Sequence, residues 1–317
     1  MSSSIISALA FASAQIIIYL GTPLLITGVI GGLFNIIVFL SLRTFRQNSC
    51  AFYMTVMSAA NIGQLMMGLL SRIVITGFNV DWILQSVFYC KFRISILYIC
   101  SLISLTSMCL VTIDQYMATS SHPHWRQWSN VKMAHRLSAV FVTIWILHGI
   151  LPSIYFDHII SPTTGSITCA SKSTIYHLYY TYGYVLILVG ILPASVTVLF
   201  GSLAYFNVRQ LAHRTLPLVR HKQLTTMVLL QVISNFFAIV PPLITMILLL
   251  QSNLLKDPVI IAQVQLANYV NYTFYYFYFA VSVNYLISNI SSTVSIFRVH
   301  FTFIYVSPND FVNNLFT

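Results

Sequence analysis

Long apolar runs alternate with short polar segments along the whole chain. Seven runs are long enough to cross a bilayer, because about 20 apolar residues in a helix span the hydrocarbon core. They cover Gln15–Leu42, Ala51–Ile75, Phe88–Met117, His135–Tyr155, Tyr180–Phe206, Thr225–Leu250 and Val264–Ser288. The pattern predicts an all-α membrane protein with a bundle of seven transmembrane helices. One domain would cover residues 1–299, followed by a short C-terminal tail at 300–317.

The composition excludes a soluble globular domain. Of the 317 residues, 58% are hydrophobic and only 6% are charged, whereas soluble domains carry about 25% charged residues. The net charge of +10 would suggest an anionic partner in a soluble protein. Here the basic residues lie between apolar runs, and no basic patch is interleaved with aromatic residues. We therefore expect the protein to lie in a lipid bilayer, and we do not expect it to bind nucleic acid.

The basic residues predict the orientation, because short cytoplasmic loops are rich in Lys and Arg. With the N-terminus outside, ten basic residues are cytoplasmic: Arg43, Arg46, Arg126, Lys132, Arg136, Arg209, Arg214, Arg220, Lys222 and Arg298. Five are then external: Arg72, Lys91, Arg93, Lys172 and Lys256. The prediction is a multi-pass protein of the plasma membrane, with its N-terminus outside and its C-terminus in the cytoplasm.

This orientation places two of the five cysteines outside, where an oxidising compartment preserves disulfides. Cys90 opens the third run and Cys169 lies in the loop after the fourth. With two external cysteines, one intramolecular pair can form, and we predict a Cys90–Cys169 disulfide. A helix from Cys90 to Asp114 would be roughly 36 Å long, so its two ends would face different compartments.

An ordered set of landmarks resembles the rhodopsin-like (class A) family of G-protein-coupled receptors. In chain order these are Asn35, Asn61, Trp82, Cys90, Asp114-Gln115-Tyr116, Trp145, Pro152, Pro193, Phe236 with Pro241-Pro242, and Asn284. The segments Arg43-Thr-Phe-Arg46 and Ser49-Cys-Ala-Phe-Tyr53 are most similar to invertebrate FMRFamide-like neuropeptide receptors.

The resemblance implies that Asp114, Gln115 and Tyr116 meet a heterotrimeric G protein at the inner end of the third helix. Gln115 stands where the family has an arginine, so Asp114 lacks its usual charged partner. We expect either a weaker restraint on the resting state or an altered coupling to the G protein. The alternative is that Asp114 simply lies in interfacial water.

Seven further residues align with the family's helix switch and polar core: Asn35, Asn61, Ser104, Pro193, Phe236, Pro242 and Asn284. Asn61 stands where a carboxylate usually helps to bind sodium. Because a hard cation prefers anionic oxygen, we expect no metal site. A cluster of hydrogen bonds between packed helices is then the favoured interpretation. The prolines should kink their helices, either as pivots or as static bends.

Ligand contacts would come from the outer half of the bundle, where the candidates are Arg72, Arg93, Tyr98, Gln265 and Tyr269. Cationic and aromatic side chains suit the carbonyls, terminal amide or acidic groups of a peptide. The alternative is that the arginines snorkel to the lipid headgroups and that the aromatic residues form an interfacial belt.

The resulting hypothesis is a receptor for an extracellular ligand, a neuropeptide in the first instance, that activates a G protein. No catalytic constellation is visible, so we expect neither an enzyme nor a cofactor. A degenerate, non-signalling receptor homologue is the first alternative. A membrane transporter is the second, and the lack of internal repeats disfavours it.

Overall fold

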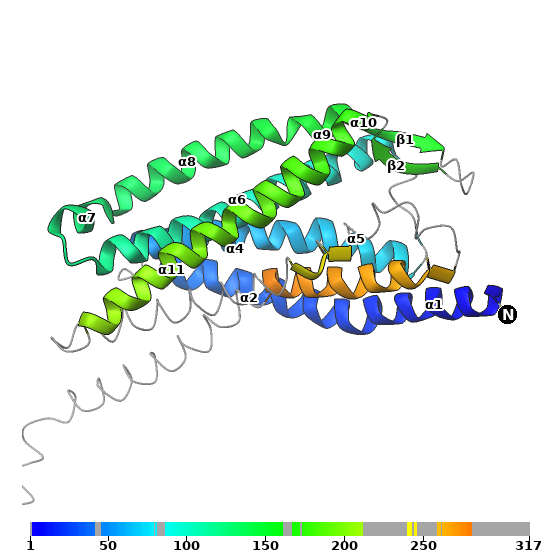
Figure 1. Cartoon of the computed structure of the whole chain (residues 1–317), viewed down its shortest axis with the longest axis horizontal. Coiled ribbons are helices and arrows are strands. Elements are labelled where there is room, and N and C mark those ends of the chain that lie inside the picture. Colours follow the sequence, from blue (N-terminus) through cyan, green and yellow to red (C-terminus); the bar gives the residue numbers. More distant parts are fainter. Residues whose placement is uncertain are drawn as a thin grey trace, which may run out of the picture.

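The chain forms a bundle of long helices in a computed structural model (Figure 1). The structure describes residues 2–41, 46–78, 80, 86–160, 167–171, 173–211, 240–242, 244–245, 259–260 and 262–280. A β-hairpin lies at one end of the bundle and the short helix α7 (Pro123–Trp128) at the other (Figure 1). We call these the hairpin end and the α7 end.

Among the described residues, five helices are long and apolar enough to cross a membrane: Ser4–Ser41, Ser49–Gly77, Val87–Thr119, Val131–Tyr155 and Thr174–Arg209. Large apolar side chains such as Phe34, Ile144 and Leu199 are exposed on their outer faces. Such a surface suits lipid and not water. The predicted helical membrane protein is therefore confirmed. Most of the predicted sixth run, part of the seventh and the 300–317 tail lie outside the described residues.

The spans are built from consecutive helical pieces. The first comprises α1 (Ser2–Ile16), η1 (Ile17–Gly21) and α2 (Thr22–Ser41), and the second α4 (Ser49–Gln64), η2 (Leu65–Leu69), α5 (Leu70–Arg72) and η3 (Ile73–Gly77). The third is α6 (Val87–Thr119), and the fourth is α8 (Val131–His148) with α9 (Ile150–Tyr155). The fifth comprises α10 (Thr174–Leu178), η4 (Tyr179–Ile191) and α11 (Leu192–Leu211). Residues 262–280 form another helix.

The first helix begins at Ser2, well before the predicted start at Gln15. The segment Ser2–Gln15 contains no Gly, Pro or charged residue, so nothing in it interrupts the helix. The prediction was wrong because this segment, rich in serine and alanine, is less hydrophobic than the run that follows.

Helix α6 is the central helix of the described bundle. In its most apolar stretch 61% of residues are buried, against 17–44% in the other four spans. It packs against α4 on one side and α11 on another, and it also contacts α8 and α9. The side chain of Ser86 caps its first turn by accepting a hydrogen bond from the Tyr89 backbone N–H.

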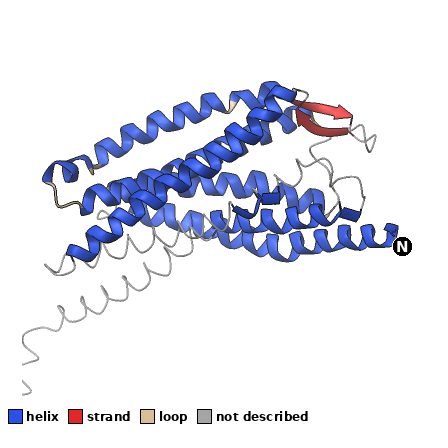
Figure 2. Cartoon of the chain, in the orientation of Figure 1, coloured by secondary structure: helices blue, strands red, loops and turns tan. Residues whose placement is uncertain are grey.

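A two-stranded antiparallel hairpin connects the fourth and fifth spans (Figure 2). Strand β1 (Phe156–Ile160) pairs with β2 (Ile167–Ser171), and His158 lies opposite Cys169. Cys169 forms the predicted disulfide with Cys90, and their Cα atoms are 6.0 Å apart, as usual for a disulfide. The hairpin is thereby attached to the start of α6.

Four stretches of the described helices are π-helical: η1, η2, η3 and η4. In a π-helix each turn takes up more residues than in an α-helix, and such turns are frequent at functional sites. Segment η4 ends two residues before Pro193, which lacks a backbone N–H. Segments η2 and η3 flank Arg72.

Removing the disulfide should destabilise the hairpin end. The bond joins residues 79 positions apart, a separation for which the chain-entropy model gives about 4.5 kcal/mol. The effect should be smaller here because membrane insertion already restricts the unfolded chain. We expect Cys90→Ser, Cys169→Ser and the double variant to lower the melting temperature of the purified protein equally.

The free cysteine Cys100 provides the control, because it lies in the same helix outside the disulfide. Cys100→Ser should change the melting temperature much less than either disulfide variant. A double variant clearly less stable than both single variants would contradict a role confined to the bond.

Candidate functional site

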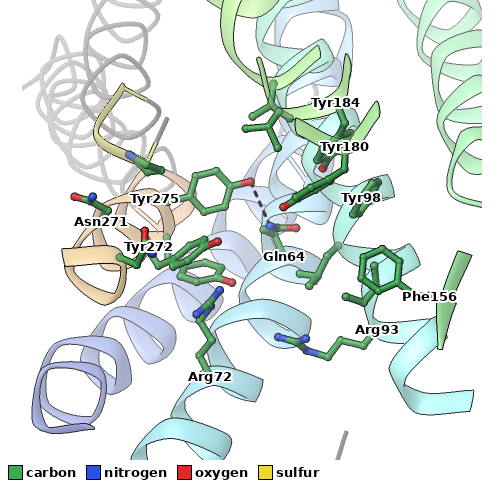
Figure 3. A pocket seen from close by; sticks show the side chains of 17 residues that line it. Gln64, Arg72, Arg93, Tyr98, Phe156, Tyr180, Tyr184, Asn271, Tyr272 and Tyr275 are labelled. Carbon is green, nitrogen blue, oxygen red and sulfur yellow. Dashed lines mark hydrogen bonds between the residues drawn. The ribbon is translucent and has the colours of Figure 1, made fainter. Parts of the chain in front are cut away.

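A cavity of about 440 Å³ opens among the helices towards the hairpin end (Figure 3). Its described lining comes from the second, third and fifth spans, from strand β1, from Pro242 and from the helix at residues 262–280. Cavities of 300–1,000 Å³ are typical of sites for small ligands. This one combines apolar side chains with two arginines, six tyrosines and three amides.

Two arginines line the cavity. The guanidinium carbon of Arg72 lies 3.7 Å from the centre of the Tyr272 ring, which is a cation–π contact. Arg93 is 9% exposed, and its Nε donates a hydrogen bond of 3.0 Å to the backbone carbonyl of Met67. Both side chains turn into the bundle (Figure 3). The interpretation that they snorkel to lipid headgroups was therefore wrong.

Tyrosine rings form the aromatic side of the cavity. Tyr98 of α6 stacks on Tyr184 of η4 with ring centres 4.0 Å apart, and Tyr180 lies 5.7 Å from Tyr184. Their spacing of four residues places Tyr180 and Tyr184 near the same face of η4. Stacked rings present a flat apolar surface with polar hydroxyl edges.

The helix at residues 262–280 approaches the second span closely at Gly68. A Cβ atom added to Gly68 would overlap the ring of Tyr276, so glycine is needed for this contact. The Tyr275 hydroxyl lies 3.0 Å from the Ser101 hydroxyl and accepts a longer hydrogen bond of 3.5 Å from Gln64 Nε2 (Figure 3). These contacts turn Tyr272, Tyr275 and Tyr276 towards the cavity.

Three of the five predicted ligand residues line the cavity, namely Arg72, Arg93 and Tyr98. Gln265 is exposed and Tyr269 is half-buried, and neither lines it. The polar lining residues that the prediction missed are Gln64, Tyr180, Tyr184, Asn268, Asn271, Tyr272, Tyr275 and Tyr276. A detectable signal existed, because polar residues at 268, 271, 272, 275 and 276 recur at helical spacing in the last apolar run.

A polar core lies deeper in the bundle. The Ser104 hydroxyl donates a hydrogen bond of 2.5 Å to Asn61 Oδ1, and both side chains are fully buried. The predicted contact between these two residues is therefore present. Asn35 is also fully buried, and its amide has no partner among the described residues. Phe236 and Asn284 lie outside the described residues.

Pro193 and Pro242 are both described. The carbonyl oxygen of Pro193 accepts a hydrogen bond of 2.7 Å from the Thr197 hydroxyl and lies 3.9 Å from Cys109 Sγ. Pro242 lines the cavity. The proline on the fifth span thus contacts the central helix through its carbonyl group.

Asp114 is buried at the α7 end of α6 and is 4% exposed. Its Oδ2 accepts a hydrogen bond of 2.7 Å from the hydroxyl of Ser49, at the start of α4. The Ser49 hydroxyl lies 3.3 Å from that of Ser129, just before α8. The interpretation that Asp114 lies in interfacial water was wrong, because these hydroxyls enclose it.

The neighbours of Asp114 differ in their surroundings. Gln115 is 2% exposed, and its Oε1 has no partner among the described residues. Tyr116 is half-buried, and its ring centre lies 5.6 Å from that of Phe200 in α11. The three consecutive residues therefore face the second span, the bundle interior and the fifth span.

The fold and the site together define a helical membrane protein with a polar, aromatic cavity near its disulfide. No protein-family model matches the chain, and no curated protein matches it in sequence. Its function is therefore argued from its own residues.

The Asn61–Ser104 hydrogen bond should couple the stabilities of the second and third spans. We expect a coupling free energy of about 0.6 kcal/mol, and at most about 1.7, from a double-mutant cycle, the range for hydrogen bonds between membrane helices. The variants are Asn61→Ala, Ser104→Ala and the double variant, measured by denaturant unfolding in mixed micelles.

The control cycle pairs Ser104→Ala with Ser7→Ala, because Ser7 is exposed in α1. Its effects should add to within about 0.5 kcal/mol. Equal coupling in the two cycles would show that Asn61 and Ser104 do not interact.

Proposed function

We propose that the protein is a rhodopsin-like G-protein-coupled receptor of the plasma membrane. It has seven transmembrane helices, an external N-terminus and a cytoplasmic C-terminus. An extracellular ligand, a neuropeptide in the first instance, binds the cavity, and a heterotrimeric G protein binds the α7 end. The ordered landmarks and the distribution of basic residues support this assignment.

The observation that carries the proposal is that one helix connects the two sites. Near its start, α6 lines the cavity with Arg93, Leu97 and Tyr98. Near its end, the same helix carries buried Asp114. A ligand acts through its differential affinity for two states of the bundle, so a shift of α6 at the cavity would be felt at Asp114.

The lining of the cavity supports a peptide as the ligand. Amides such as Gln64 and Asn271 can pair with peptide groups, and the tyrosine rings can contact apolar side chains. The arginines can bind carbonyl or carboxylate oxygens. The cavity volume suits the end of a peptide and not a folded partner.

A non-signalling receptor homologue is the second candidate, and Gln115 favours it. The side chain there is neutral and buried, whereas the resemblance implies an arginine that engages the G protein. In this second case the cavity binds its ligand without activating a G protein.

Restoring the arginine tests the proposal. We expect Gln115→Arg to raise G-protein activation at a fixed peptide concentration by at least about tenfold, since a hydrogen bond involving a charged group contributes about 1.5 kcal/mol or more. Activation would be measured in cells with a panel of G-protein sensors and a panel of neuropeptides, after normalising for surface expression.

Gln127→Arg is the matched control, because it adds the same charge at an exposed position in α7. It should leave activation unchanged. A protein that reaches the surface but activates no G protein, with either residue at position 115, would contradict signalling and leave the non-signalling homologue.

A further inference from the structure

The cavity contains the cation Arg72, which has no acidic residue beside it in the described lining. No Asp or Glu belongs to that lining, and the Arg72 guanidinium group packs on the uncharged Tyr272 ring. Cations inside a membrane protein are costly unless a partner compensates them. The cavity is therefore electrostatically suited to an anion and unsuited to a cationic ligand.

Arg72 has an unused hydrogen-bond donor. Its Nε is buried and has no partner among the described residues, while its guanidinium group packs on the Tyr272 ring. Aromatic contacts hold the group in place without satisfying all of its donors. An anionic oxygen would satisfy the remaining donor and gain a charge-assisted hydrogen bond.

Gln64 has an unused acceptor in the same cavity. It is 4% exposed, and its Oε1 has no partner among the described residues, although Nε2 bonds weakly to Tyr275. Figure 3 shows Gln64 near the centre of the cavity, with Arg72 on one side and the Tyr98, Tyr180 and Tyr184 rings on the other. A ligand N–H directed at Gln64 would satisfy this acceptor.

The tyrosine side of the cavity suits an apolar or aromatic body. The Tyr98 and Tyr184 rings are parallel to within 17°, and both line the cavity. A ligand with a carboxylate, a neighbouring amide N–H and an aromatic group would use all three features. These groups occur together in an N-acylated aromatic amino acid and at the free C-terminus of a peptide.

We propose that the cavity binds an acylamino carboxylate, with its carboxylate on Arg72, its amide N–H on Gln64 and its side chain against Tyr98 and Tyr184. This inference rests on the proposed receptor function and sharpens it. It selects ligands with a free carboxylate over amidated peptides and over amines.

Matched acid and amide probes test the inference on the full-length protein in detergent. The probes are N-acetyl-L-phenylalanine, its amide, and the tripeptide Ala-Ala-Phe as acid and as amide. A ligand that binds the folded state raises the melting temperature with its concentration. We expect the acids to bind at least tenfold more tightly than the amides, as a charge-assisted hydrogen bond implies.

Variants then test which residue causes the preference for acids over amides. Arg72→Gln should abolish it, Arg72→Lys should retain part of it, and Gln64→Leu should weaken acids and amides alike. Lys91→Gln is the control, because Lys91 lies on α6 outside the cavity lining and should leave the preference intact. The relative affinities of the two acids show whether a free acylamino acid or a peptide terminus fits better.

Three results would overturn the inference: no acid stabilises the wild-type protein, the amides bind as tightly as the acids, or the preference survives Arg72→Gln. G-protein activation separates this inference from the proposed function. Acid-selective binding without activation would support the carboxylate site and contradict the proposed signalling function. Activation by an amidated peptide, unaffected by Arg72→Gln, would support the receptor function and contradict the carboxylate site.

Discussion

The polar side chains of α6 must form their hydrogen bonds inside the bundle, and the arrangement of the other helices depends on this constraint. Lipid provides no hydrogen-bond partners, so polar groups at membrane depth must find them in neighbouring helices. Five residues of α6 do so in succession, each with a partner on another helix: Ser95 with Ser153, Ser101 with Tyr275, Ser104 with Asn61, Thr106 with Trp145, and Asp114 with Ser49. Together they fix the rotation and the depth of α6, because either motion would break several of them at once.

The same bonds connect the cavity to the polar core. Ser101 contacts Tyr275 in the cavity wall, and Ser104, one turn further along α6, contacts Asn61. A ligand that displaces Tyr275 therefore acts on a residue one helical turn from the buried Asn61–Ser104 pair. In the proposed receptor, this short route is where binding would begin to bias the bundle.

Features that depend on a local sequence pattern could be predicted. Contacts that depend on how each helix is rotated in the bundle could not. Apolar length predicted the five spans that the structure describes, and compartment reasoning predicted the Cys90–Cys169 pair. The tyrosines at 272, 275 and 276 share a helical spacing that marks one face. They were missed because aromatic residues occur on every side of that segment, and the face that turns inward depends on the space left by Gly68. The partner of Asp114 was missed because Ser49 lies 65 positions away and carries no charge to mark it.

The π-helical stretch η2 has a geometric consequence for the cavity. Residues eight apart in an α-helix are rotated by roughly 80° relative to each other, since each residue turns by about 100°. Gln64 and Arg72 are eight apart, yet both line the cavity. The π-helical turn between them contains more residues than an α-helical turn, which reduces the angle between the two side chains. The effect on the second span resembles the insertion of one residue. The cavity's amide and its cation share one wall because of how this helix is wound, and the pattern of side chains alone would have placed them on diverging faces.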